Sequence, residues 1–372
     1  MSSSHRWGSR IIDMKIKSLE VKNFRNYPEL FLEITNDMVI LVGPNAVGKS
    51  NLLESVYFSS LFKSFRDDPG SIFMHGTGNL EVKVGFEREG EKHELEVFLE
   101  RRDKIYANFK HNGVLKKKKQ VQGMVSVVIF EPSDVELFSK QPEARRKYLN
   151  MVLAQKDPGY LEALQNYKKA LSMKNRLLSD MRTGQTSGED LAEWNNQLVE
   201  YGSYIILRRK EFVEYANANL QEIYSLITGF NKPIELKLST IEGTTLEQIQ
   251  ENFKLRLERN SEKEKGAGVG LVGPHRDDFS LESEGSPVIQ YSSRGERRSQ
   301  VLALKVIELE FLSEGDDKPI LLLDDVLSEL DETRRMFFIK YLQGKFQTFI
   351  TTTHPLEIIA QHITLTPSID EE

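Results

Sequence analysis

The 372-residue chain shows two kinds of hydrophobic pattern. Near both ends, apolar residues form short runs or alternate with polar ones, and in the middle they recur at the three-and-four spacing of helices. Residues 38–42 and 319–323 are short unbroken apolar runs, as in strands covered on both faces. Residues 15–34 and 80–109 largely alternate, which predicts antiparallel strands, and Asn112-Gly113 is a strong two-residue hairpin signal. The pattern predicts an α/β fold, a mixed sheet with an antiparallel annex.

The middle of the chain predicts a different kind of structure. Apolar residues recur at three-and-four spacing over residues 158–181 and again over 191–215, typical of two antiparallel helices packed along one seam. At ~1.5 Å per residue each helix would be about 40 Å long. We therefore predict a short helical arm, residues 151–264, inserted into a head built from residues 14–150 and 265–372.

Capping signals indicate further helices. Residues 132–136 form a capping box that predicts a helix start. Pro142 suits the first position of another helix. Thr245, with Gln248 three residues later, predicts a helix that ends near Arg259. The Lys- and Glu-rich segment 260–268 then predicts a mobile turn.

Composition narrows the chemistry that the chain can perform. The sequence has 39% hydrophobic and 28% charged residues and no cysteine, which is ordinary for a globular protein and excludes disulfides, thiolate metal ligands and cysteine nucleophiles. No apolar run reaches the ~20 residues of a membrane span, so we expect a cytoplasmic protein. The Ser- and Arg-containing residues 1–13 are expected to be a leader outside the fold. With a net charge of −6, any contact with nucleic acid must be local.

A phosphate-binding loop follows the apolar run 38–42. Gly43, Gly48, Lys49 and Ser50 fit the pattern G-x-x-x-x-G-K-[ST] and precede a helical apolar pattern, which is the context that the motif requires. In such a loop, backbone N–H groups converge on a phosphate at a helix N-terminus. Lys49 would neutralise the β- and γ-phosphates of ATP, and Ser50 would bind Mg²⁺.

The predicted nucleotide site includes the whole loop and a nearby turn. Its expected members are Gly43, Pro44, Asn45, Ala46, Val47, Gly48, Lys49, Ser50 and Asn51. Arg25 and Asn26 lie in the turn between the first two predicted strands and come near the loop if these strands flank residues 38–42. The alternative is that they are only turn residues.

Two carboxylates, Asp324 and Asp325, follow the apolar run 319–323. At this position in phosphate-loop enzymes Asp324 would complete the Mg²⁺ site and Asp325 would orient or activate the attacking water. Lys49 and Asp324 are 275 residues apart, far more than in compact phosphate-loop enzymes. This spacing predicts a large module inserted between two halves of one head.

Two basic runs have alternative interpretations. Lys116, Lys117, Lys118 and Lys119 would lie on the return strand of the Asn112-Gly113 hairpin. There they either protect a sheet edge from aggregation or contact the DNA backbone. The basic triplet 145–147 is more typical of a solvated helix face.

The motifs together resemble the RecF recombination-mediator family, within the ATP-binding-cassette and SMC class. The resemblance covers nearly all of residues 14–355 and includes KNFRNYP, Ser64-Phe65-Arg66, PEARRKYLN, the segment 273–278 and TTTH. It implies that Ser293, Arg294, Gly295 and Glu296 form the signature motif, that residues 328–331 form a D-loop ending in Asp331, and that His354 is the switch histidine. SRGE differs from the SGGQ of transporters by a charged residue in its middle.

The resemblance also implies a function. Members of this family are ATP-dependent homodimers that bind ATP and Mg²⁺ and hydrolyse ATP slowly, with Lys49, Asp325 and His354 as the corresponding catalytic residues here. They bind gapped DNA at junctions of single and double strands and act with RecR and RecO in loading recombinase. This implies a role in DNA repair and replication at the nucleoid.

Three other classes of ATPase share some of these motifs. The charged signature and the paired helices argue against a transporter subunit. A nuclease of the overcoming-lysogenisation type would need a metal-binding domain after His354, where few residues remain. The short arm argues against a chromosome-tethering ATPase. ATP-dependent binding of DNA would separate the favoured interpretation from the transporter.

Overall fold

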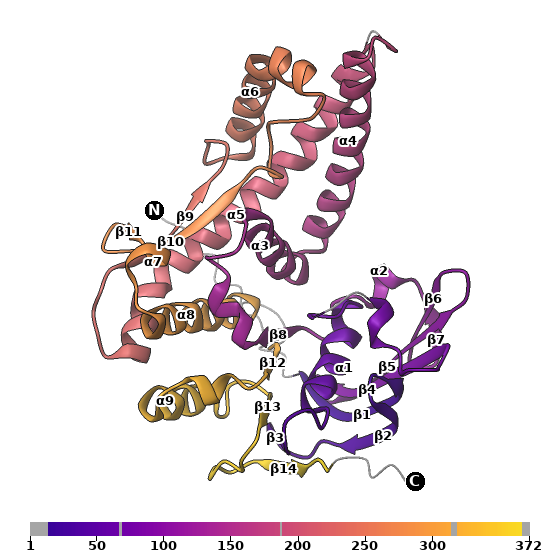
Figure 1. The fold of residues 1–372 in the computed structure, drawn as a ribbon, viewed down its shortest axis with the longest axis vertical. Helices are drawn as coiled ribbons and strands as arrows, with labels where there is room; N and C mark the ends of the chain where they lie inside the picture. The colour runs from indigo at the N-terminus through magenta and orange to yellow at the C-terminus, as the bar shows by residue number, and fades with distance from the viewer. Residues whose placement is uncertain (1–13, 67–68, 187, 314–317, 367–372) are drawn as a thin grey trace. The chain divides into compact units, whose positions relative to one another are not determined.

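The computed structural model describes residues 14–66, 69–186, 188–313 and 318–366 (Figure 1). The leader predicted at residues 1–13 lies outside them. The chain divides into two compact units: unit 1 contains the residues up to Asp134 and those from Glu308 onward, and unit 2 contains Val135–Ile307. Unit 2 is wider than the predicted arm, 151–264, because a preceding helix and a small sheet pack with the arm helices.

The centre of unit 1 is a parallel five-stranded sheet in the order β14-β3-β13-β12-β8. Its strands are β3 (Met38–Val42), β8 (Val127–Phe130), β12 (Ile320–Leu323), β13 (Thr348–Thr352) and β14 (Gln361–Thr364). All residues of β3, β8 and β12 are buried, as their apolar runs predict. Because all pairs are parallel, the carboxyl ends of β3 and β12 share one edge of the sheet.

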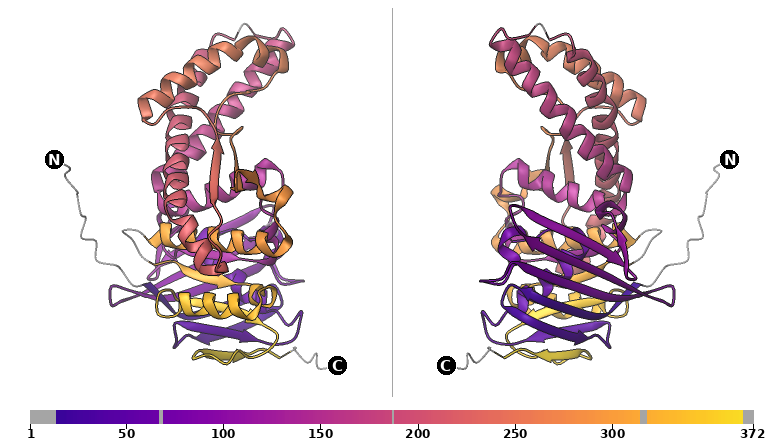
Figure 2. Two further views of the ribbon diagram at one scale, coloured as in Figure 1. Left: turned by 90° about the vertical axis from the view of Figure 1, so that its left-hand side faces the viewer. Right: turned by 90° about the vertical axis from the view of Figure 1, so that its right-hand side faces the viewer.

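A second, antiparallel sheet completes unit 1, in the order β2-β1-β4-β5-β6-β7 (Figure 2, right-hand view). Its strands are β1 (Met14–Phe24), β2 (Tyr27–Glu33), β4 (Asn79–Arg88), β5 (Glu91–Arg101), β6 (Ile105–His111) and β7 (Val114–Lys116). Helix α1 (Lys49–Leu61) contacts both sheets. The predicted α/β fold with antiparallel strands is confirmed, with the two kinds of strand in separate sheets.

The predicted hairpin turn is present, but the lysine run after it is not a strand. Asn112 and Gly113 both have positive φ, 50° and 75°, as a type I′ turn requires. Strand β7 ends at Lys116, and α2 (Lys118–Val121) begins directly afterwards. The side chain of Gln120 accepts from the Lys117 N–H at 2.9 Å, and the completely buried Val121 draws the chain inward. The prediction of four lysines on one strand was therefore wrong.

Among the described residues, three short 3₁₀ turns and one further helix lie in unit 1 or at the point where the chain passes into unit 2. They are the 3₁₀ turns η1 (Pro69–Ile72), η2 (Pro132–Glu136) and η3 (Val326–Glu329), and the helix α9 (Glu332–Leu342) follows η3. Residues 132–136 were predicted to start a helix and form only η2. The Asp134 carboxylate accepts from the Glu131 N–H at 3.0 Å, which closes a tight local turn instead.

Unit 2 is built on three long helices. Helices α4 (Pro158–Arg182) and α5 (Leu191–Thr228) pack along the predicted seam, and α6 (Leu246–Ala267) contacts both. Asp157 caps α4 by accepting from the Gly159 N–H at 2.8 Å. Helix α5 has 38 residues, about 57 Å at 1.5 Å per residue, and is longer than predicted.

Smaller elements join these helices to the signature segment. They are α3 (Pro142–Lys156), the three-stranded sheet of β9 (Ile234–Ser239), β10 (Asp278–Ser283) and β11 (Ser286–Pro287), then α7 (Val288–Tyr291) and α8 (Arg294–Ser313). Pro142 occupies the first turn of α3, as predicted. None of the helices in the described ranges is both long and apolar enough to cross a membrane.

The segment predicted as a mobile turn, 260–268, is instead the end of α6. Glu264 is 3% exposed and forms an ion pair of 2.6 Å with Lys174, which is fully buried on α4. Glu264 also accepts from the Leu271 N–H at 2.7 Å. Lys174 occupies a position in the apolar seam of α4, and Glu264 is its ion-pair partner there. Burial lowers the pKa of Lys174, although Glu264 opposes this change.

A second buried ion pair fixes the segment 273–278. Arg209 donates to the Asp277 carboxylate at 2.6 Å and to the Pro274 carbonyl at 2.7 Å, and both charged side chains are at most 3% exposed. Arg145 of α3 forms two bonds with Asp278, of 2.6 and 2.7 Å. The start of β10 is therefore held to both α3 and α5.

Candidate nucleotide site

The phosphate loop joins β3 to α1 and has the close backbone packing that its glycines permit. Gly48 has φ 107°, and a Cβ added to it would lie 2.6 Å from the Asn26 amide and 2.7 Å from the Tyr27 hydroxyl. A Cβ on Gly43 would lie 2.6 Å from the Leu365 carbonyl oxygen. Both glycines are therefore required by sterics, independently of any ligand.

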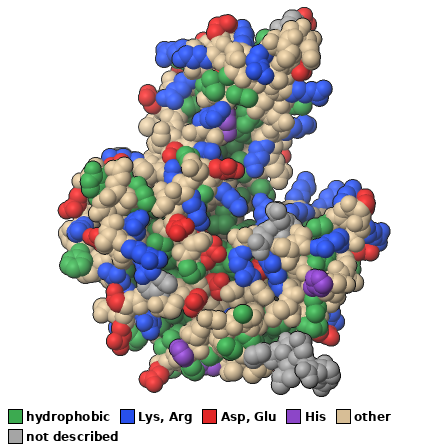
Figure 3. Space-filling model, in the orientation of Figure 1, with side chains coloured by type: hydrophobic (Ala, Val, Ile, Leu, Met, Phe, Trp, Pro, Cys, Tyr) green, Lys and Arg blue, Asp and Glu red, His purple; other side chains and the backbone are tan. Residues whose placement is uncertain are grey.

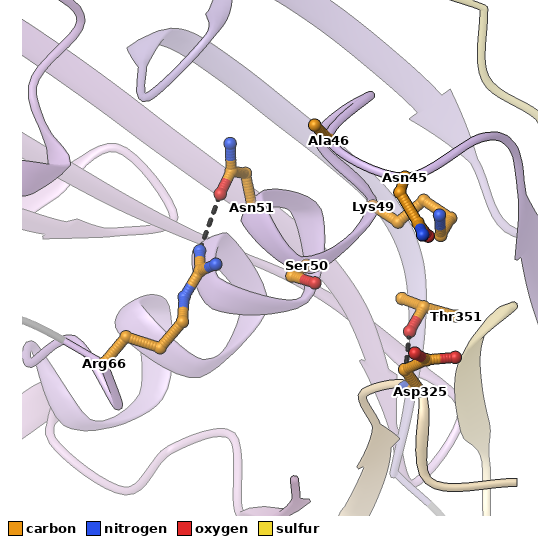
Figure 4. A pocket seen from close by; sticks show the side chains of 9 residues that line it. Asn45, Ala46, Lys49, Ser50, Asn51, Arg66, Asp325 and Thr351 are labelled. Atoms are coloured by element: carbon orange, nitrogen blue, oxygen red, sulfur yellow. Dashed lines mark hydrogen bonds between the residues drawn. The ribbon is translucent and has the colours of Figure 1, made fainter. Parts of the chain in front are cut away.

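A pocket of about 160 Å³ opens beside this loop (Figure 4). Six of its lining residues come from the predicted loop, one is the predicted Asp325, and two were not predicted. The lining residues are Asn45, Ala46, Gly48, Lys49, Ser50, Asn51, Arg66, Asp325 and Thr351. Gly43, Pro44 and Val47 belong to the same loop but do not line the pocket.

Lys49 lies against the loop backbone. Its side chain is 8% exposed, and its ammonium donates to the carbonyl oxygens of Gly43 and Pro44, at 2.8 Å each. A phosphate oxygen is a stronger acceptor than a neutral carbonyl. The ammonium can therefore exchange these bonds for bonds to an anion at the same loop.

Ser50 and Asp324 meet at the sheet edge, as predicted. The Ser50 hydroxyl donates to Asp324 Oδ1 at 2.6 Å, and the Thr351 hydroxyl donates to the same oxygen at 2.9 Å. Hydroxyl and carboxylate oxygens are ligands that Mg²⁺ accepts, with water and phosphate completing its shell. The donor set therefore fits Mg²⁺, which Ser50 and Asp324 would hold.

Asp325 occupies an unusual backbone conformation next to this pair. Its φ is 54°, a left-handed value that aspartate adopts more readily than most residues. Its N–H donates to Thr351 Oγ1 at 2.8 Å, so one threonine of β13 holds both carboxylate-bearing residues. Figure 4 shows Asp325 and Thr351 together on the side of the pocket opposite Arg66.

A buried glutamate organises the other side of the pocket. Glu54 of α1 is fully buried and accepts from Arg25 at 2.9 and 2.7 Å, from Ser64 at 2.5 Å and from Arg66 at 2.5 Å. We call these four residues the Glu54 cluster. Arg66 also donates to Asn51 at 2.6 Å. The cluster therefore fixes Arg66 at the pocket wall.

The electrostatics of the cluster favour an ionised Glu54. Burial alone would raise the pKa of this carboxyl, but the hydrogen bonds from Arg25, Ser64 and Arg66 outweigh it and lower the pKa. Sequence reasoning assigned no role to Glu54 or Arg66. For Glu54 the available signal was an acidic residue inside the apolar pattern of α1, and for Arg66 it was the segment Ser64-Phe65-Arg66, which forms part of the family resemblance.

Arg25 and Asn26 have different surroundings. Arg25 is bound to Glu54 and donates to the Ser71 carbonyl at 2.9 Å, and it does not line the pocket. Asn26 donates to the Val47 carbonyl at 3.2 Å and accepts from Asn51 at 2.7 Å. Asn26 thus contacts the phosphate loop directly, and Arg25 acts on the pocket through Glu54.

The signature segment lies in unit 2 and forms a capping box at the start of α8. The Glu296 N–H donates to the Ser293 hydroxyl at 3.3 Å, and the Ser293 N–H donates to the Glu296 carboxylate at 2.9 Å. Lys232 pairs with the same carboxylate at 3.0 Å. The bond from the Ser293 backbone, with help from Lys232, lowers the pKa of Glu296 to about 2. Arg294 and Gly295 occupy the first turn of the helix.

Asp331 precedes α9 and His354 follows β13, and neither lines the pocket. Asp331 is exposed and caps α9 by accepting from the Arg334 N–H at 2.9 Å. His354 is exposed, and its N–H donates to the Thr352 hydroxyl at 3.3 Å. Both side chains are therefore accessible to another molecule.

The predicted basic surface is exposed on unit 1. Lys117, Lys118 and Lys119 are exposed and Lys116 is half-buried. In the part of the chain that the structure describes, none of the four forms an ion pair with a carboxylate. Figure 3 shows lysine and arginine side chains gathered over α2 and the β6–β7 hairpin.

Comparison with known proteins identifies close relatives. The family model described as the RecF/RecN/SMC N terminal domain matches residues 15–366. The "DNA replication and repair protein RecF" of Natranaerobius thermophilus is 35% identical over 352 residues, covering 91% of each chain. The protein of that name from Staphylococcus epidermidis is 36% identical over 361 residues, covering 91% of this chain and 93% of the relative.

Solved structures of similar fold include two of RecF. The structure described as the recombination mediator protein RecF-ATPrS in the RecFOR pathway has a TM-score of 0.87 at 31% identity, covering 95% of this chain and 96% of that one. The corresponding RecF-ATP structure has a TM-score of 0.86 at 32% identity, covering 95% of both. An Smc head domain from Pyrococcus furiosus has a TM-score of 0.52 at 16% identity, covering 92% of this chain and 90% of that one, and shares the fold alone.

Proposed function

Since this chain belongs to the RecF family, we propose that it is an ATP-dependent DNA-binding protein of replication and recombinational repair. The observation that carries the proposal is the 2.6 Å contact between Ser50 and Asp324. It joins a complete phosphate loop to an acid-bearing strand that is 274 residues away in the chain. Relatives of 31–32% identity have been solved as RecF-ATP and RecF-ATPrS.

Each element of the pocket has a role in this proposal. The backbone of residues 43–51 and the Lys49 ammonium bind the phosphates of ATP. Ser50 and Asp324 would hold Mg²⁺, which would neutralise phosphate charge when it is bound. Asp325 orients the attacking water and accepts its proton. Arg66, held by Glu54, places a guanidinium beside the phosphates, where it favours negative charge.

We propose that a second copy of the chain completes the site. Ser293, Arg294, Gly295 and Glu296 belong to unit 2, and neither Asp331 nor His354 lines the pocket of unit 1. In the proposed dimer the signature residues 293–296 come from the partner subunit and contact the same ATP. A two-fold axis then produces two equivalent sites with two ATP molecules between the heads. Slow hydrolysis would release the dimer.

DNA and other proteins are the proposed partners of this dimer. The relatives are named for DNA replication and repair and for the RecFOR pathway. By that likeness we propose binding at gaps, where single and double strands meet, and cooperation with RecR and RecO in loading recombinase. Lys116, Lys117, Lys118 and Lys119 are the proposed contacts with DNA phosphates.

A mixing experiment tests the shared site. Lys49→Ala should abolish ATP binding, and Ser293→Arg should bind ATP but remain monomeric, so each variant alone is inactive. A heterodimer of the two has one intact site, which combines the phosphate loop of one chain with the signature of the other. We expect mixing to restore part of the ATP hydrolysis.

Asp325→Asn provides the matched control, because it should bind ATP, hydrolyse it slowly and form a stable dimer. Sedimentation with ATP, with ADP and without nucleotide measures the dimer. No recovery of hydrolysis on mixing, together with normal dimerisation of Ser293→Arg, would contradict the shared site. Unchanged ATP affinity of folded Lys49→Ala by calorimetry would contradict the nucleotide site itself.

A further inference from the structure

We propose that the β6–β7 hairpin contacts DNA bases through Val114 and Leu115, in addition to the phosphate contacts of the neighbouring lysines. This inference rests on the proposed binding of DNA and specifies how one surface of unit 1 takes part in it. The hairpin is the edge of the antiparallel sheet, and among the strands of the described ranges β7 pairs with β6 alone.

The apolar side chains of this hairpin are unusually exposed. Leu115 is 67% exposed and Val114 is 57% exposed. They are consecutive residues of a three-residue strand, so they point to opposite faces of the sheet edge. An edge strand that only needs protection from aggregation carries charged residues or proline at such positions. We therefore infer that a binding partner covers these two aliphatic side chains.

The charge around the hairpin indicates the kind of partner. Residues 101–119 contain eight lysines and arginines and one acidic residue, Asp103, in a chain with a net charge of −6. Lys118 is fixed with its ammonium 5.6 Å from the centre of the Phe62 ring. This excess of positive charge favours an anionic partner.

An exposed aromatic side chain with cations beside it lies on β6, in the same hairpin. Tyr106 is 40% exposed, and Arg102 and Lys104 lie 5.5 and 5.3 Å from the centre of its ring. Aromatic rings with neighbouring cations are the usual platforms on which bases stack. The β6–β7 hairpin and the start of α2 therefore offer cations for phosphates and apolar groups for bases.

Nucleic acid has the complementary chemistry, because its backbone is anionic and its bases have apolar faces. Aliphatic side chains of DNA-binding proteins insert between base steps and partly unstack them. Unstacking costs least where a base is already unpaired or lies at an interruption of the duplex. We therefore place Leu115 or Val114 against the last base pair beside a gap, with the lysines 116–119 on the adjoining phosphates.

The experiment uses the full chain with ATP and gapped DNA that carries 2-aminopurine at the base beside the gap. Fluorescence of 2-aminopurine rises when its base is unstacked, and titration at several salt concentrations gives both the affinity and its salt dependence. A double variant, Val114→Ser with Leu115→Ser, removes the apolar contact and keeps every charge. Phe31→Ser is the matched control, because Phe31 is 62% exposed on β2, at the opposite edge of the same sheet.

We expect the double variant to bind roughly tenfold more weakly, with the fluorescence rise lost and the salt dependence unchanged. Alanine at residues 116–119 should instead flatten the salt dependence, by up to about 0.9 log units of slope for each lost phosphate contact. Wild-type affinity and a full fluorescence rise in the double variant would overturn the inference. The proposed DNA binding would fail separately, if the wild-type chain with ATP bound no DNA.

Discussion

Replacing Glu54 by glutamine tests how the Glu54 cluster supports the nucleotide pocket. The substitution keeps the shape of the side chain but removes a fully buried charge that faces Arg25 and Arg66. Removing one partner of a buried ion pair costs 3–5 kcal/mol in typical cases. Because Arg25 and Arg66 keep 16% and 32% of their side-chain surface exposed, water can solvate them in part. We therefore expect a loss of about 3 kcal/mol in the free energy of unfolding.

The dependence on pH gives this prediction a second readout. The folded-state pKa of Glu54 is lowered from its ordinary value of 4.5. A lowered folded-state pKa contributes stability that is present above the unfolded-state pKa and lost as the pH falls through the folded-state pKa. The difference in stability between wild type and Glu54→Gln should therefore be full at neutral pH and shrink under acidic conditions below pH 4.5.

Urea unfolding combined with hydrogen exchange of α1 peptides measures the free energy of unfolding. Calorimetry measures the affinity of the pocket for ATP. ATP affinity should fall as well, because Arg66 loses its anchor. Glu96→Gln is the control: Glu96 pairs with Lys110 at 2.6 Å, but the Lys110 side chain is 41% exposed, so the pair contributes about 0–1 kcal/mol. Equal effects of the two substitutions, or a pH-independent loss in Glu54→Gln, would refute the reasoning.

Two other substitutions test the packing described above. Gly48→Ala should abolish ATP binding in a chain that still folds, because the added Cβ would lie 2.6 Å from the Asn26 amide at φ 107°; calorimetry checks this, and retained affinity would contradict the steric account. Lys174→Met should destabilise unit 2 by about 3–5 kcal/mol because Glu264 is left buried and unpaired. Adding Glu264→Gln should recover more than half of that loss. Urea unfolding, followed by Trp194 fluorescence in a Trp7→Phe background, measures the stability of the single and the double variant. No recovery of stability in the double variant would count against the ion pair.

The sequence predicted two kinds of element correctly. In one kind the interacting residues are close together in the chain, and in the other a motif requires particular neighbouring elements. The phosphate loop needs a buried strand before it and a helix after it, and that requirement placed Ser50 correctly. The apolar run before Asp324 indicated a second buried strand, so the meeting of Ser50 with Asp324 could be anticipated. The Asn112-Gly113 turn was equally local.

Features that depend on which face of a helix is buried could not be predicted. Glu54 reads as one more polar residue of α1 until the packing of that helix shows that it is fully buried. Lys174 looks like a defect in an apolar seam because its partner, Glu264, is 90 residues away and in a segment that composition marks as a loop. The burial of Val121 overrode the strand pattern of the lysine run.

The strand order of unit 1 has a consequence for synthesis on the ribosome. The antiparallel sheet is complete once residue 116 has been made, whereas the parallel sheet lacks β12, β13 and β14 until residue 364. At the usual 5–20 residues per second, this interval of 248 residues lasts about 12–50 s. During that time β3 has neither of its neighbours, β13 and β14, and Asp324 is not yet beside Ser50 for most of it. A nascent chain therefore cannot assemble the nucleotide pocket before Asp325 and Thr351, which line it, have been made.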